Sequence, residues 1–224
     1  MNKEYDAVFI HGQGYSDRPG RDPVPSVRGR LQASAIRTLQ RAGYSFDNFV
    51  FSGIPFRGQA LSMSNLNADA VQTRTGVDES RLVIDQTART TSMEVRFSRR
   101  QTEINNWKRV MHLTYGEIHQ DQIRQLVDRE FGKRGIEVDV FRADEVLTDP
   151  SYFDPNSNRD LRNLERYRAF IDCYNQSDTE RQVLIYERRK YTFMGWRFDL
   201  GNRMLETISL FYRPDPSNKS DIRK

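Results

Sequence analysis

Residues 7–27 have the sequence AVFIHGQGYSDRPGRDPVPSV, in which a short apolar run passes at once into a stretch rich in glycine and proline. A run of four apolar residues predicts a strand that is buried on both faces, as in a parallel sheet. Beyond this stretch, apolar residues recur at helical spacing, at Leu31, Ala35 and Leu39. The chain therefore begins with a strand, a long loop and a helix, which is the first half of a β-α-β unit.

The same alternation continues through the first two thirds of the sequence. Further strands are expected at residues 49–51, 82–84, 110–114 and 136–140, and helices at 31–42, 59–74, 93–107 and 123–131. The last strand alternates apolar with charged residues, which is typical of a sheet edge. We therefore predict an α/β fold, a Rossmann-like three-layer sandwich with a mostly parallel sheet of five to six strands.

The pattern changes after Leu147. Residues 149–159 are rich in Asp, Pro, Asn and Ser and predict a linking loop. Beyond them we expect a helix at 161–171, a strand at 183–186, a helix at 204–212 and a frayed tail from 214. This divides the chain into an α/β domain at 1–147 and a C-terminal extension at 148–224 that packs on the same domain.

Composition excludes several classes of protein. The 35 Lys and Arg residues nearly balance the 31 Asp and Glu residues, and the net charge is +4. This balance argues against nucleic acid as a partner, although the basic run 188–190 keeps that alternative open. One cysteine excludes a disulfide framework, and no apolar run approaches a membrane span. We expect a cytoplasmic protein with no membrane partner.

Candidate site residues follow the expected strands, because open α/β sheets bind ligands at the carboxyl ends of their strands. Glycines let backbone N–H groups approach an anion, arginines add charge-assisted hydrogen bonds, and hydroxyl groups orient the ligand. The candidate ligand-binding residues are His11, Gly12, Gly14, Arg28, Arg30, Ser52, Gly53, Thr91, Thr114 and Arg124. His119 is the candidate catalytic acid or base.

Each candidate also has a purely structural interpretation. The arginines would be solvated residues of a surface loop, Ser52-Gly53 a turn, and the hydroxyl groups near Thr91 helix caps. His11 and His119 are expected to converge and could ligate a metal with a carboxylate, but no local ligand spacing supports this, so no metal is expected.

Short motifs in residues 5–147 resemble the YdcF-like family, which includes SanA- and ElyC-type proteins. They are Arg30-Leu31, Ser52-Gly53, Gly76-Val77 through Ile84, Thr91, Leu113-Thr114, His119 and Arg124. The chain departs from the family pattern in having fewer consecutive glycines after the first strand and Thr90 in place of an asparagine. The resemblance implies a Rossmann-like fold and suggests S-adenosylmethionine as a cofactor.

Two functions are compatible with these residues. The first is binding of a small anionic or nucleotide-like ligand, with hydrolysis or group transfer at a phosphate as the reaction that suits the arginines. The second is a non-catalytic ligand sensor or scaffold. It would dock a partner through the aromatic residues of its C-terminal extension, which are Tyr191, Phe193, Trp196 and Phe198.

Overall fold

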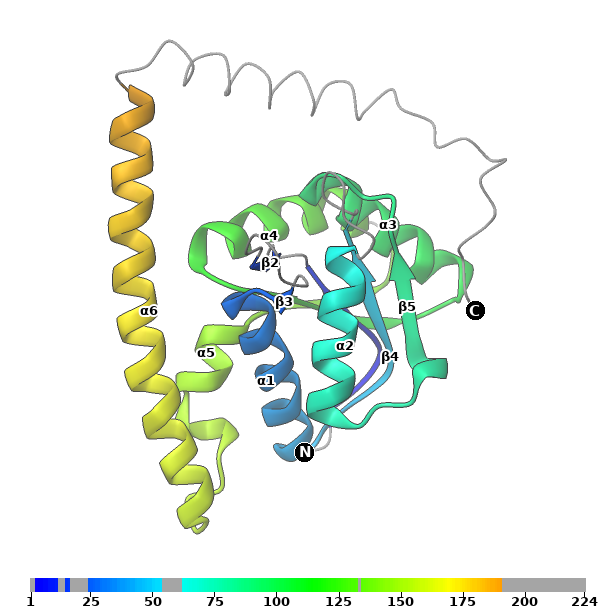
Figure 1. The fold of residues 1–224 in the computed structure, drawn as a ribbon. Helices are drawn as coiled ribbons and strands as arrows, with labels where there is room; N and C mark the ends of the chain where they lie inside the picture. The colour runs from blue at the N-terminus through cyan, green and yellow to red at the C-terminus, as the bar shows by residue number, and fades with distance from the viewer. Residues whose placement is uncertain (1–2, 12–14, 17–23, 54–61, 133, 191–224) are drawn as a thin grey trace. The chain divides into compact units, whose positions relative to one another are not determined.

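The computed structural model describes residues 3–11, 15–16, 24–53, 62–132 and 134–190. Its main sheet has five strands, all parallel, in the order β5-β4-β1-β6-β7 (Figure 1). The strands are β1 (Lys3–Ile10), β4 (Tyr44–Ser52), β5 (Leu82–Asp85), β6 (Arg109–Thr114) and β7 (Glu137–Arg142). The expected Rossmann-like α/β sandwich is confirmed.

Helices cover both faces of this sheet. One face carries α1 (Val27–Arg41), α2 (Met63–Thr75) and α5 (Ala143–Thr148), and the other carries α3 (Thr91–Ile104) and α4 (Glu117–Phe131). Three of these helices begin at a hydroxyl residue whose side chain accepts a hydrogen bond from a first-turn N–H group, at Ser26, Ser62 and Thr90.

The core lies between the sheet and these helices. Under α3 and α4, Phe9 and Val110 of the sheet pack with Val95 and Ile123 of the helices in one buried cluster. Because side chains alternate along a strand, the intervening residues of the central strand face α1 and α2. All four residues of 7–10 are buried, as the apolar run predicts.

The strand order places a reversal at the centre of the sheet. From β1 the chain moves outward through α1 to β4 and through α2 to β5. It then returns across the opposite face through α3 to β6, which pairs with the other side of β1. The ends of β1 and β6 are therefore the switch point, where doubly wound sheets bind their ligands.

Two shorter features lie outside the main sheet. Within the first loop, β2 (Tyr15–Ser16) pairs with β3 (Val24–Pro25) in an antiparallel ladder. A 3₁₀ turn, η1 (Glu79–Arg81), precedes β5.

Beyond β7 the structure differs from the sequence prediction. After α5 come a 3₁₀ turn, η2 (Pro150–Tyr152), and one long helix, α6 (Asn158–Lys190). The strand expected at 183–186 is wrong, because these residues continue α6. No glycine or proline interrupts residues 158–190, so nothing in the sequence breaks the helix there. The helix expected at 204–212 lies outside the described residues.

Contacts between residues divide the chain into two compact units. The first contains the sheet, its helices and the beginning of α6 up to Leu164, and the second begins at Glu165. Among the helices described, none is both long and apolar enough to cross a membrane.

Candidate functional site

The three histidines of the chain meet at the switch point of the sheet. His11 follows β1, and its ring lies nearly parallel to the ring of His112 in the neighbouring strand β6, with centroids 5.0 Å apart. The ring of His119, in the first turn of α4, is nearly perpendicular to the ring of His11, and the two centroids are 6.1 Å apart. The convergence of His11 and His119 expected from the fold is therefore observed. We call His11, Arg28, Glu94, His112, Tyr115 and His119 the switch-point cluster.

A chain of hydrogen bonds runs through the buried part of this cluster. The Nδ1 atom of His11 lies 3.0 Å from a carboxylate oxygen of Glu94 on α3. Its Nε2 atom lies 2.8 Å from Nδ1 of His112. Because both ring nitrogens of His11 have protein partners, His11 supports the cluster from within, and its ring is not directed at a ligand.

Burial sets the protonation of these rings. It lowers the pKa of His11 to about 3, and burial together with the nearby His11 lowers the pKa of His112 well below its usual value. At neutral pH both rings are neutral, so His11 donates from Nδ1 to Glu94 and accepts at Nε2 from His112. The remaining nitrogen of His112, Nε2, is buried and has no hydrogen-bond partner among the described residues.

His119 and Arg28 form the less buried side of the cluster. His119 is half-buried, and its pKa is lowered to about 3 by burial first, and then by His11 and Arg28. The guanidinium of Arg28 lies 5.7 Å from the ring centroid of Tyr115. The cluster therefore presents a neutral imidazole beside a permanent positive charge.

Helix α4 begins next to these two side chains. Its N-cap residue is Gly116, with φ of 78°, which has no side chain to accept from the first-turn N–H groups. The backbone N–H of Gly116 itself donates to Asp144 at 3.3 Å. The positive end of the α4 dipole thus lies beside Arg28 and His119.

Gln32 of α1 ties the two central strands together at this point. Its side-chain amide donates to the carbonyl of His11 at 3.1 Å and to that of Leu113 at 3.2 Å. Gln32 is fully buried, and its own carbonyl oxygen has no partner among the described residues.

Ser52 and Gly53 lie at the end of β4, where a carboxylate organises the backbone. The hydroxyl of Ser52 donates to Asp85 at 2.7 Å, and Asp85 also accepts from Thr87 and from the N–H of Ala88. The Ser52 hydroxyl therefore has a buried protein partner. Gly53 has φ of 150° and packs against Met63 so closely that a Cβ atom would lie 2.9 Å from the methionine methyl group.

The other candidates are placed differently. Arg30 is exposed and lies two residues from Arg28 on α1, a spacing that points the two side chains in different directions.

The Thr114 hydroxyl is buried and donates to the carbonyl of Phe141. Thr91 is half-buried at the first position of α3, after the capping residue Thr90. Arg124 is exposed and lines a different cavity, described below. Gly12 and Gly14 lie outside the described residues.

Sequence reasoning missed two inner members of the cluster. They are Glu94, in the first turn of α3, and His112, within the strand β6. The strand order could have identified them, because α3, the helix that returns across the sheet, must pass over β1 and β6. Among the described residues, no group of three or more His, Cys, Asp or Glu side chains is arranged to hold a metal ion.

Comparisons with known proteins add no assignment: no family model, no curated protein and no solved structure matches the chain.

Proposed function

We propose that the switch-point cluster binds a small anionic ligand that carries a phosphate group or resembles a nucleotide. The observation that supports this most directly is the position of Arg28 and His119 beside the uncapped start of α4. Arg28 would pair with the anion, and first-turn N–H groups of α4 would donate to its oxygens. The strand order independently supports this position, because open α/β sheets bind ligands at the switch point.

His119 would act as the proton acceptor of this site. Its lowered pKa keeps the ring neutral, and a neutral imidazole can accept a proton from water or a hydroxyl group. A bound anion would raise that pKa, because a nearby negative charge favours the imidazolium form. In a hydrolysis, the oxygen of water would bond to phosphorus, the bond from phosphorus to the leaving group would break, and the water proton would pass to His119.

Thermal unfolding in the presence of candidate ligands tests the binding. The probes are ADP, glucose 6-phosphate, inorganic phosphate and S-adenosylmethionine, the last because of the resemblance to the YdcF-like family. At least one should raise the Tm in proportion to the logarithm of its concentration. If none does, the proposal fails and the scaffold function is favoured. The aromatic residues 191–198 on which that alternative depends lie outside the described residues.

Matched variants then locate the site. Arg28→Gln should weaken binding of the active probe by roughly tenfold, since a charge-assisted hydrogen bond is lost. Arg37→Gln is the control, because Arg37 is an exposed arginine of the same helix whose guanidinium donates to a carbonyl in α2. His119→Gln should abolish the proton uptake that accompanies binding, measured by calorimetry in buffers of different ionisation enthalpy. Equal affinity in Arg28→Gln and Arg37→Gln would place the ligand elsewhere.

A further inference from the structure

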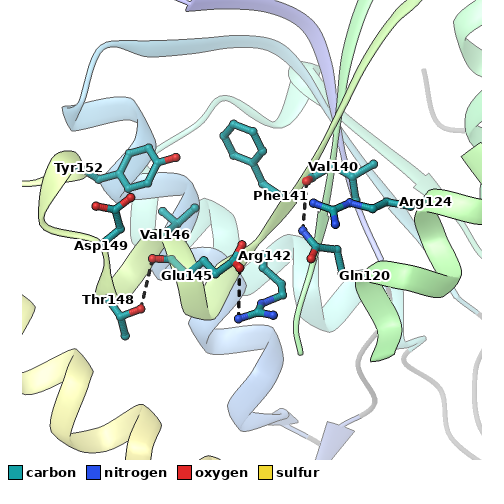
Figure 2. A pocket seen from close by; sticks show the side chains of 10 residues that line it. All are labelled: Gln120, Arg124, Val140, Phe141, Arg142, Glu145, Val146, Thr148, Asp149 and Tyr152. Carbon is teal, nitrogen blue, oxygen red and sulfur yellow. Dashed lines mark hydrogen bonds and ion pairs between the residues drawn. The ribbon is translucent and has the colours of Figure 1, made fainter. Parts of the chain in front are cut away.

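A cavity of about 450 Å³ lies beside the edge strand β7, between α4, α5 and η2 (Figure 2). Its volume falls in the range of roughly 300–1,000 Å³ that is usual for small-molecule sites. It shares no residue with the switch-point cluster. Polar groups lie at both ends of the cavity, and apolar side chains lie between them.

Arg124 supplies the positive end. Its guanidinium points toward the same space as the amide of Gln120 (Figure 2). Gln120 is held in place because its amide donates to the carbonyl of Val140 at 3.3 Å. Arg124 is exposed and forms no hydrogen bond or ion pair with the part of the chain that the structure describes. Its charge is therefore available to a ligand.

The positive charge of Arg142, the second arginine of the cavity, is already balanced by neighbouring carboxylates. Its guanidinium lies 3.2 Å from a carboxylate oxygen of Asp144 and 3.3 Å from one of Glu145. Glu145 is thereby occupied as well. Arg124 can therefore balance the single negative charge of a carboxylate, but not the two negative charges of a phosphate monoester.

Asp149 supplies the negative end, across the cavity from Arg124 (Figure 2). One of its carboxylate oxygens accepts from the N–H of Ser151 at 2.9 Å, which fixes the side chain and leaves the second oxygen able to accept. Tyr152 lies beside it, and burial raises the pKa of Tyr152 to about 12, so its hydroxyl group stays protonated. The aromatic ring of Phe141 and the side chain of Val146 lie between the two charged ends.

We propose that this cavity binds an ω-amino carboxylic acid, with its carboxylate at Arg124, its ammonium at Asp149 and its methylene chain over Phe141 and Val146. The charges of the cavity are separated by an apolar floor, and a zwitterion with charges at its two ends is complementary to that arrangement. The inference does not depend on the proposed function, because the two sites have no residue in common.

Calorimetric titration with three compounds of matched length tests the chemistry. The probes are 6-aminohexanoate, which carries both charges, hexanoate, which has only the carboxylate, and hexylamine, which has only the ammonium. The full chain should bind 6-aminohexanoate at least about tenfold more tightly than either of the others, since each lacks one charge-assisted contact. Equal affinity for hexanoate, or no heat with any probe, would overturn the proposal.

Paired variants test the two ends. Arg124→Gln should weaken 6-aminohexanoate about tenfold and leave hexylamine unchanged, and Arg129→Gln on the same helix, outside the cavity, should leave both unchanged. Asp149→Asn removes the negative charge but keeps a side-chain oxygen that can accept from the N–H of Ser151. Asp154→Asn is its matched control, because Asp154 accepts from Asn156 in the same way but does not line the cavity. Equal effects of Asp149→Asn and Asp154→Asn would refute the assigned orientation.

Discussion

Acidification should destabilise this protein, starting well above the pH at which carboxylates begin to protonate. In the unfolded chain a histidine has a pKa near 6.5, whereas in the folded protein the pKa of His11 is about 3 and that of His112 is also strongly lowered. Between these values the unfolded state binds more protons than the folded state. The free energy of unfolding therefore falls as the pH falls below about 6.5, and continues to fall toward pH 3.

The magnitude follows from the linkage relation. A histidine that titrates only in the unfolded state costs about 1.4 kcal/mol of stability between pH 7.5 and pH 5.5. His11 and His112 are both fully buried, so together they should cost about 2.7 kcal/mol over this interval. The pKa of His119 is also lowered to about 3, so His119 adds a similar share. Histidine is the side chain whose ordinary pKa lies in this pH interval, and all three histidines of the chain belong to the switch-point cluster. The change in stability over this interval therefore reports on the cluster.

Urea denaturation at pH 7.5 and 5.5, at constant ionic strength and followed by circular dichroism, measures the difference. The variant His119→Gln should retain most of the loss, since His11 and His112 are still present. A free energy of unfolding that stays constant or rises on acidification would refute the assignment of neutral rings. It would mean that His11 is an imidazolium paired with Glu94.

Three further predictions concern stability and are measured by urea denaturation at neutral pH. Gly53→Ala should cost roughly 2–3 kcal/mol, because alanine is strained at a φ of 150° and its Cβ would lie 3.3 Å from the Cβ of Met63. Gly76→Ala, at a φ of 71° with no atom within 4 Å, should cost only about 1 kcal/mol, and equal costs would contradict this reasoning. Asp85→Ala should cost about 2–3 kcal/mol because four hydrogen bonds to its carboxylate are lost, and an unchanged midpoint would show that water replaces them. Leu39→Ala should cost about 3 kcal/mol through the cavity left at a fully buried position, and a loss below about 1 kcal/mol would mean that the core collapses around it.

The central strands could be predicted because apolar runs buried on both faces are conspicuous in a sequence. Their full extent could not: β1 begins at Lys3 and β4 at Tyr44, in segments where polar and apolar residues mix. The run at 183–186 shows the limit of this signal. Four consecutive apolar or aromatic residues fit a strand or one turn of a helix equally well, and the uninterrupted helical context of α6 decides between them.

The candidate site could be predicted only in outline. Topology alone brings the residues after β1 and β6 together, so the meeting of His11 and His119 followed from the strand order. The choice between Arg28 and Arg30 depends on which side of α1 faces Tyr115, and periodicity does not determine that for residues at the very start of a helix. Glu94 reaches His11 from a helix 83 residues further along the chain, a pairing that no local pattern records.

The amide of Gln32 places an unusual demand on one position in the middle of a helix. The backbone carbonyls of His11 and Leu113 both accept from the side-chain nitrogen of Gln32. The residue at position 32 must therefore have a side chain as long as glutamine that ends in two N–H donors. Leucine or methionine would fill the volume but would remove both of these hydrogen bonds, and glutamate would place a negative charge against the two carbonyl oxygens. Among homologous chains, position 32 should therefore vary far less than its helical neighbours, for a reason that hydrophobicity does not reveal.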